Sequence, residues 1–558
     1  MEQTKKLIFF FIISVILGVF SPRAGFPQFS KKLPSHKPKL IVTIVLDPFS
    51  FDQLNRYHDR FGEGGFRKLT DQGCYFRNAR YNFFFTESTS GIATLATGAN
   101  PSVHGITGAS WYEPLYNREI RCTEDDQASA VGGSFENGQH SPVKLLTSTL
   151  GDEMRLNSRF GSKVFSVSID AESAVLLGGH LANGIYWFDD VNGIWMSSSF
   201  YMDSLPQWVH QFNEKDLTRF YLQKSWNTLL PLTNYTASLS DSTDTRKGIN
   251  NHTLFPYNLK KLSAVGRKKE NLSLIRLTPY ANTFTKDFVT NLILNEQLGK
   301  DNTCDFLGVV FSANHYILDA FGPMSVEAED AMLRLDQDIA DFISFIDKEI
   351  GKENVLLILT ASRGITPDPT YMQTLRMPSG YFNPNQAMAL LRSYLNVIYG
   401  EGNWVKGYHN HQIYLNHILI ENANLNLYTM QDKVADFMIQ FIGVNRTITA
   451  HALRESGNTG DLFIRLQNGY FPKRSGDIFV ILDPGWEEKT GDKESNGTGF
   501  WYDSHVPLIW YGWKMPRKII YYPVDISAVA PTLSFFLNIP APNGSQGILL
   551  EYLLDGKI

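Results

Sequence analysis

The sequence predicts an α/β fold in three layers, with helices on both faces of a mainly parallel sheet. Several segments are apolar without interruption, which is typical of strands buried on both faces of a parallel sheet. Segments between them repeat apolar residues every three or four positions, as helices do. We expect the strands at residues 39–47, 163–170, 306–314, 354–362 and 505–512.

The clearest helical segment is 325–351, "SVEAEDAMLRLDQDIADFISFIDKEIG", which a glycine ends. Two stretches depart from the alternation of strands and helices. Residues from about 196 to 300 are rich in Trp, Tyr, Asn, Ser and Thr, and we expect them to form a cap over the carboxyl edge of the sheet. Residues from about 364 to 480 form a second insertion. The sequence therefore predicts one domain, residues 38–558, with two insertions.

The first residues have the composition of a secretory signal. Two lysines precede an apolar run of about 14 residues, and small and turn-forming residues follow it. We expect a signal peptide at residues 1–24 and a soluble mature chain without a membrane span, in the periplasm or outside the cell. Because the run is shorter than the ~20 residues of a membrane helix, an uncleaved anchor is the alternative.

Composition excludes some functions. The formal net charge is −5, and Lys and Arg are dispersed, so we expect no nucleic-acid partner. The three cysteines, Cys74, Cys122 and Cys304, lack metal-finger spacing and allow at most one disulfide. An envelope protein or a ligand that the sequence does not identify is the expected partner.

Polar residues gather where the predicted strands end. Carboxylates and imidazoles from separate strands, together with a hydroxyl at the start of a helix, are typical of a metal-assisted hydrolase with a covalent nucleophile. The candidates are Asp47, Thr86 and Ser88 in "TESTSGIATLATG", His315 and Asp319 in "NHYILDAFGP", Ser362 and Arg363, and His505 in "YDSHVPL".

The text around these residues resembles the alkaline phosphatase superfamily, in particular the bacterial PafA-like phosphatases that use a threonine nucleophile. The matching text is "IVLDPFSFDQLNRY", "FGEGGFRKL", "TGANPSVHGITGASWY", "FSANHYILDAFGP", "DSHVPLIWYG" and "VDISAVAPTLSFFLNIPAPNGSQG". The resemblance runs from about residue 40 to the end, apart from the insertions. It implies an alkaline-phosphatase-like fold. It also implies two zinc ions that hold phosphate, activate a hydroxyl nucleophile and stabilise the leaving oxygen.

Transferred residue by residue, the resemblance implies an incomplete site. Asp47 stands at the first aspartate ligand, and Ser88 stands at the threonine nucleophile. The family's aspartate and histidine of one zinc site appear in reverse order as His315 and Asp319, with His505 as the matching histidine. This set could hold one zinc. The adjacent Asp-His pair of the other zinc site is replaced by Ser362 and Arg363, so a full two-zinc site is not expected.

The groups that hold phosphate in the family are replaced as well. Its asparagine corresponds to Ala109, and its lysine and arginine correspond to Asp170 and Glu172. A phosphoryl dianion would therefore meet negative charge where the family provides donors. One hypothesis is that Arg363 neutralises the vacated metal site beside Asp47 and pairs with Asp170 and Glu172. The alternative is an arginine that points into solvent from a remodelled loop.

These observations favour an exported pseudo-phosphatase with a binding or scaffolding role. The main alternative is a divergent hydrolase of phosphoric or related esters that uses Ser88 as nucleophile and one zinc. Ser88 could instead be only a helix cap. A third alternative, resting on composition alone, is a carbohydrate- or envelope-binding module that uses aromatic residues such as Trp187, Trp195, Tyr201 and Trp208.

Overall fold

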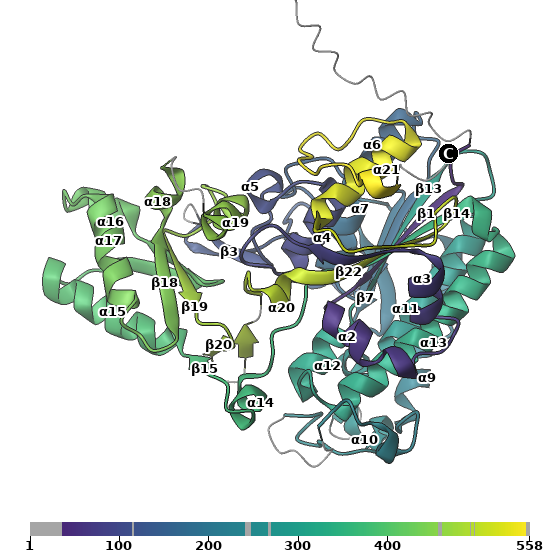
Figure 1. The fold of residues 1–558 in the computed structure, drawn as a ribbon, viewed down its shortest axis with the longest axis horizontal. Coiled ribbons are helices and arrows are strands. Elements are labelled where there is room, and N and C mark those ends of the chain that lie inside the picture. The colour runs from purple at the N-terminus through teal and green to yellow at the C-terminus, as the bar shows by residue number, and fades with distance from the viewer. Residues whose placement is uncertain are drawn as a thin grey trace, which may run out of the picture.

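The computed structural model shows a layered α/β domain with a smaller lobe beside it (Figure 1). The expected signal peptide, residues 1–24, lies outside the described residues. Within the part of the chain that the structure describes, no helix is both long and apolar enough to cross a bilayer. The structure describes residues 36–113, 116–239, 247–265, 269–455, 460–490, 493–495 and 497–553.

The centre of the molecule is an eleven-stranded sheet in which five neighbouring strands run parallel. All residues of these strands are buried, which explains why their sequences do not alternate between apolar and polar positions. The predicted α/β class with a mainly parallel sheet is confirmed. In sheet order the five are β14 (Val355–Ala361), β1 (Leu40–Leu46), β13 (Asp305–Phe311), β6 (Val164–Ser168) and β7 (Gly184–Asp189).

One of the predicted strands runs against the others. β22 (His505–Gly512) is antiparallel to β14, with Leu508 opposite Thr360. Its first residue, His505, therefore lies at the same edge of the sheet as the carboxyl ends of the parallel strands. The remaining strands of the sheet are β2 (Cys74–Arg80), β23 (Lys518–Ile520) and β24 (Val524–Asp525) at one side, and β8 (Ile194–Ser198) and β5 (Ala130–Val131) at the other.

Helices cover both faces of the sheet (Figure 1). One layer contains α3 (Phe66–Gln72), α11 (Tyr280–Asn295) and α13 (Val326–Glu349), and the other contains α4 (Ser88–Thr97), α6 (Leu150–Asn157), α7 (Ala171–Gly178) and α21 (Val529–Leu537). α11 lies in the range expected to form the cap. It packs against β6, β13 and α13, so this helix belongs to the layer that covers the sheet.

The aromatic residues of β7 and β8 belong to the core. Trp187 and Trp195 are almost fully buried, and Trp195 stacks on Phe284 and Phe288 of α11. Burial removes these two tryptophans from the aromatic residues that could bind a carbohydrate at the surface.

The second predicted insertion contains a sheet of its own. Its four antiparallel strands are β16 (Val405–His409), β17 (Gln412–Leu415), β19 (Ile478–Leu482) and β18 (Val444–Thr449). α15 (Pro384–Tyr399) and α17 (Leu427–Met438) pack on this sheet around a separate apolar core. The lobe extends to the left of the main sheet in Figure 1.

A glycine in α4 lets this helix approach the end of β14. A Cβ atom at Gly91 would lie 1.9 Å from the carbonyl oxygen of Ser362, far inside contact distance. The close approach brings the first turn of α4 to the residues that follow β14.

We expect Gly91→Ala to lower the free energy of unfolding by about 1–3 kcal/mol, because the backbone must shift to admit the methyl group. Urea denaturation measures the change. Gly460→Ala is the matched control, because no atom lies within 4 Å of its added Cβ, and we expect a change of no more than about 0.5 kcal/mol. Equal stabilities of the two variants would contradict the close packing at Gly91.

Candidate active site

Asp47 is the centre of the polar cluster at the carboxyl edge of the sheet. It follows β1, it is 3% exposed, and one oxygen, Oδ1, accepts hydrogen bonds from two serines. The hydroxyls of Ser88, at the start of α4, and Ser362, after β14, each donate to this oxygen over 2.5 Å. The structure thus brings together three residues that the sequence predicted from separate strand ends.

Ser88 is not the cap of its helix. The residue in the N-cap position of α4 is Glu87, and the Ser88 hydroxyl points to Asp47. Glu87 accepts a hydrogen bond from the backbone N–H of Ala109 over 2.8 Å, and burial raises the pKa of its carboxyl group. Ala109 itself provides no side-chain donor, so its position adds no positive or hydrogen-bonding group beside Ser88.

Arg363 is buried, and it lies beside Ser88. Its side chain is 6% exposed, and no other Lys or Arg in the described residues is as deeply buried. Nε donates to the Ser88 hydroxyl over 3.4 Å, and Nη1 donates to the carbonyl of Gly364 over 3.3 Å. The alternative of an arginine that points into solvent is therefore wrong. The guanidinium reaches Asp47 only through Ser88.

The expected ion pairs between Arg363 and two carboxylates do not form. Asp170, the N-cap residue of α7, instead pairs with Arg276 of the 3₁₀ helix η3 (Leu272–Leu277), with Oδ1 and Nη1 3.2 Å apart. Tyr316 donates to the same carboxylate and accepts from Arg276 over 2.6 Å. Burial raises the pKa of Asp170, although Arg276 and Tyr316 oppose the rise.

Glu172 also has a partner other than Arg363. It forms an ion pair with Arg121, the last residue of β4 (Arg118–Arg121). Burial acts to raise its pKa, but His140 and Arg121 outweigh that effect and hold the pKa of Glu172 below its ordinary value. Among the described residues no carboxylate lies within 4 Å of the Arg363 guanidinium. The hypothesis of direct pairing with Asp170 and Glu172 is therefore wrong.

The predicted one-zinc ligands lie apart. His315 and Asp319 share a face of α12 (Ala313–Phe321), with Nε2 and Oδ2 3.7 Å apart. His505 lies between Phe51 and Trp501, with ring centroids 4.3 Å and 4.2 Å away. Its Nε2 donates to the carbonyl of Arg77 over 2.8 Å, so this nitrogen has no lone pair for a metal.

The residues that the resemblance assigns to the other zinc site, Ser362 and Arg363, do not fit a metal ion. The Ser362 hydroxyl donates a hydrogen bond to Asp47. The guanidinium of Arg363 has no lone pair and carries a positive charge. In the described residues no three His, Cys, Asp or Glu side chains form a group that could hold a metal. A single zinc at His315, Asp319 and His505 stays a prediction.

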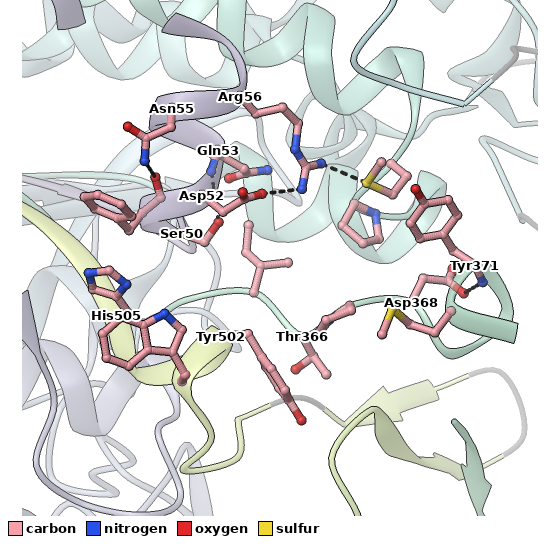
Figure 2. A pocket seen from close by; sticks show the side chains of 17 residues that line it. Ser50, Asp52, Gln53, Asn55, Arg56, Thr366, Asp368, Tyr371, Tyr502 and His505 are labelled. Carbon is pink, nitrogen blue, oxygen red and sulfur yellow. Dashed lines mark hydrogen bonds and ion pairs between the residues drawn. The ribbon is translucent and has the colours of Figure 1, made fainter. Parts of the chain in front are cut away.

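Two adjoining cavities open at this edge of the sheet. One, of about 540 Å³, is lined by Arg363 together with His315, Tyr316 and Asp319. The other, of about 480 Å³, lies between α2 (Phe51–Arg56), α14 (Pro369–Thr374) and the residues around His505 (Figure 2). The cavities share four lining residues, which are Pro323, Ile365, Thr366 and Asp368.

The family model described as "Type I phosphodiesterase / nucleotide pyrophosphatase" matches residues 41–505. The chain belongs to this family. It is 36% identical over 540 residues to the "Calcium-transporting ATPase" of Myroides odoratus, covering 94% of this chain and 96% of that protein. It is 34% identical over 516 residues to the alkaline phosphatase PafA of Elizabethkingia meningoseptica, covering 92% and 93% of the two chains.

The crystal structure of wild-type PafA superposes with a TM-score of 0.89 at 33% identity, covering 93% of this chain and all of that one. A PafA variant with Thr-to-Ser, Asn-to-Ala, Lys-to-Ala and Arg-to-Ala substitutions superposes with a TM-score of 0.88 at 34% identity, covering 93% of this chain and 99% of that one. The predicted membership of the alkaline phosphatase superfamily, with likeness to the PafA-type enzymes, is confirmed.

Two partners in this site have no signal in the sequence. Arg276 comes from the expected cap, 106 residues from Asp170, and Arg121 comes from a short hairpin. A search of the first insertion for an arginine that compensates the new carboxylates could have suggested Arg276, but Arg121 lies outside both insertions.

We expect Arg276→Met to destabilise the fold by about 3 kcal/mol at neutral pH, because it leaves the carboxylate of Asp170 buried without its cation. Loss of Arg276 raises the folded-state pKa of Asp170 further above its ordinary value of 3.8. A raised carboxyl pKa favours the folded state only while the group is protonated. The variant should therefore lose stability as the pH rises from about 4, as urea titrations at several pH values would show.

Arg219→Met is the control, because Arg219 pairs with Asp216 and Glu270 at the surface, where such pairs contribute at most about 1 kcal/mol. Adding Asp170→Asn to Arg276→Met should recover part of the lost stability and remove its pH dependence. A loss that does not change between pH 4 and pH 8 would show that Asp170 is not its cause.

Proposed function

We propose that this chain is an exported pseudo-phosphatase, in which a phosphatase-like site serves binding and not turnover. The observation that carries the proposal is the buried Arg363 beside Ser88. The resemblance implies a zinc ligand at this position, and a guanidinium there repels a cation and cannot coordinate one. The export part rests on residues 1–24 of the sequence alone.

The hydrogen bonds of Ser88 support the loss of turnover. Its proton lies on the short bond to Asp47, and the nearest cation, Arg363, is 3.4 Å from its oxygen. A serine hydroxyl becomes a useful nucleophile when a base removes its proton and a cation stabilises the resulting oxyanion. Here the same Asp47 oxygen also accepts from Ser362, so its capacity to take the Ser88 proton is reduced.

The phosphate-holding positions support the same conclusion. The PafA variant described above carries serine and alanine for threonine and asparagine, and this chain carries Ser88 and Ala109 at the positions that the resemblance assigns to those two residues. At the lysine and arginine positions, where the PafA variant carries alanine, this chain carries the carboxylates Asp170 and Glu172. Arg276 and Arg121 neutralise these two carboxylates. Loss of one oxyanion donor commonly costs about a hundred- to a thousandfold in rate.

The test is turnover and zinc content of the purified full chain. We expect no hydrolysis of aryl phosphates, phosphodiesters or sulfates above the level of Ser88→Ala, and much less than one zinc per chain by elemental analysis. PafA, assayed in parallel with the same substrates, is the positive control.

The rival function, a one-zinc ester hydrolase, predicts different results. It requires near-stoichiometric zinc and a rate that falls in Ser88→Ala. Zinc binding should then also fall in His315→Ala. Those three results together would replace the pseudo-phosphatase proposal with the hydrolase.

A further inference from the structure

The cavity between α2, α14 and α20 (Trp501–Ser504) is enclosed mainly by apolar and aromatic side chains. Figure 2 shows α2 above it, His505 and Tyr502 at one side, and Tyr371 at the other. Its volume of about 480 Å³ lies within the usual range for small-molecule sites, about 300–1,000 Å³. The size and the lining therefore fit a small molecule with a large apolar part.

Three rings contribute to one wall of this cavity. The imidazole of His505 lies between Phe51 and Trp501, with ring centroids 4.3 Å and 4.2 Å away. Its Nε2 donates to the Arg77 carbonyl, and burial lowers its pKa, so the imidazole is neutral at pH 7. Aromatic rings attract one another beyond the area that they bury, both stacked and edge to face. A flat ring is therefore the favoured apolar part of the ligand.

The charged groups that line this cavity are compensated within the protein. Arg56 pairs with Asp52. Asp368 accepts the backbone N–H groups of Thr370 and Tyr371 over 2.7 Å and 3.0 Å. A charged ligand would therefore lose its hydration here without gaining an unpaired partner of opposite charge. An uncharged ligand is favoured.

One buried polar atom in the lining has no hydrogen-bond partner. Gln53 of α2 is 3% exposed, and its Oε1 accepts no hydrogen bond. Among the described residues that line this cavity, no other buried side-chain nitrogen or oxygen lacks a partner. A buried acceptor without a donor costs free energy. The terminal amide of a glutamine turns readily about its last torsion, so an N–H or O–H group in the cavity can donate to this oxygen.

We propose that the cavity between α2, α14 and α20 binds an uncharged aromatic molecule with one hydrogen-bond donor, such as an indole or a phenol. The rings of Phe51, Trp501 and His505 contact its aromatic part, and Gln53 accepts from its donor. The inference rests on the proposed function and deepens it, because it gives the class of molecule that the site binds. Arg363 and the second cavity take no part in it.

The experiment measures binding of indole to the purified full chain by calorimetry. 1-Benzofuran is the matched probe, because it has the same shape with an oxygen in place of the N–H group. Indole should bind about fivefold more tightly, the equivalent of ~1 kcal/mol for one hydrogen bond. A second set compares neutral 3-ethylindole with indole-3-acetate and tryptamine, which are charged at pH 7. Both charged probes should bind at least about tenfold more weakly than 3-ethylindole, because their charge loses its hydration.

Gln53→Met tests the acceptor. Indole should then bind only as tightly as 1-benzofuran, whose own affinity should stay within about twofold of the wild-type value. Gln386→Met is the matched control and should change neither affinity. Gln386 is the third residue of α15, as Gln53 is of α2, and it is exposed and outside the cavity. Both residues donate their backbone N–H to the N-cap side chain of their helix.

Met372→Ser tests the apolar wall. It should weaken binding of all three uncharged probes at least about threefold, because apolar surface is replaced by a hydroxyl. Met377→Ser should leave binding unchanged, because Met377 is 47% exposed and lines neither cavity. Thermal unfolding without ligand shows whether each variant folds. Gln53→Met should unfold at no lower temperature than the wild-type chain, because it removes an acceptor that has no donor.

The results separate this inference from the proposed function. If no uncharged probe binds, if 1-benzofuran binds as tightly as indole, or if a charged probe binds more tightly than 3-ethylindole, the ligand class is wrong while the absence of turnover can still hold. If indole binding is unchanged in Gln53→Met or in Met372→Ser, indole binds elsewhere and the inference is overturned. Ser88→Ala should bind indole as the wild-type chain does, because Ser88 does not line this cavity. Ester cleavage that depends on Ser88 would make the proposed function wrong whatever the indoles do.

Discussion

The carboxylate of Asp47 is the group on which the organisation of this site depends. It lies at the end of the central strand β1, between β13 and β14, where it is almost fully buried. A buried carboxylate requires hydrogen-bond donors or a cation. Here the hydroxyls of Ser88 and Ser362 donate to one of its oxygens. The guanidinium of Arg363 donates to the Ser88 hydroxyl and does not contact Asp47 directly. In this structure the carboxylate of Asp47 is held by hydrogen bonds.

The carboxylates of Asp170 and Glu172, which the sequence resemblance assigns to phosphate-holding positions, are each paired with an arginine. Asp170 pairs with Arg276 and Tyr316, and Glu172 pairs with Arg121. Arg276 also lies 3.6 Å from Asp190, and the charge of Arg363 opposes the rise in pKa that burial causes at Glu87 and Asp503. The backbone framework around these pairs is that of the PafA-type enzymes.

Much of the framework could be predicted from the sequence, for a physical reason. Strands buried on both faces are apolar throughout, so the end of an apolar run marks the end of a strand in the sequence. The carboxyl ends of parallel strands meet at one edge of the sheet. That logic located Asp47, Ser88 and Ser362 together. It could not locate Arg276, which lies in the first insertion, or Arg121, which lies in a short hairpin, because neither contact leaves a periodic signal in the sequence. It also grouped His505 with His315, although His505 lies between the rings of Phe51 and Trp501 and donates to the backbone of β2.

The substitutions form a consistent set only when they are taken together. A guanidinium beside a metal site would repel the metal, and in this structure Asp47 is held by the hydroxyls of Ser88 and Ser362. Carboxylates at Asp170 and Glu172 without Arg276 and Arg121 would be buried charges, each of which costs several kcal/mol. All of these groups are instead paired or hydrogen-bonded, including Arg363, which donates to Ser88 and to the carbonyl of Gly364. A buried arginine at this place has a reason within the protein itself, because its charge opposes the rise in pKa that burial causes at the carboxyl groups of Glu87 and Asp503.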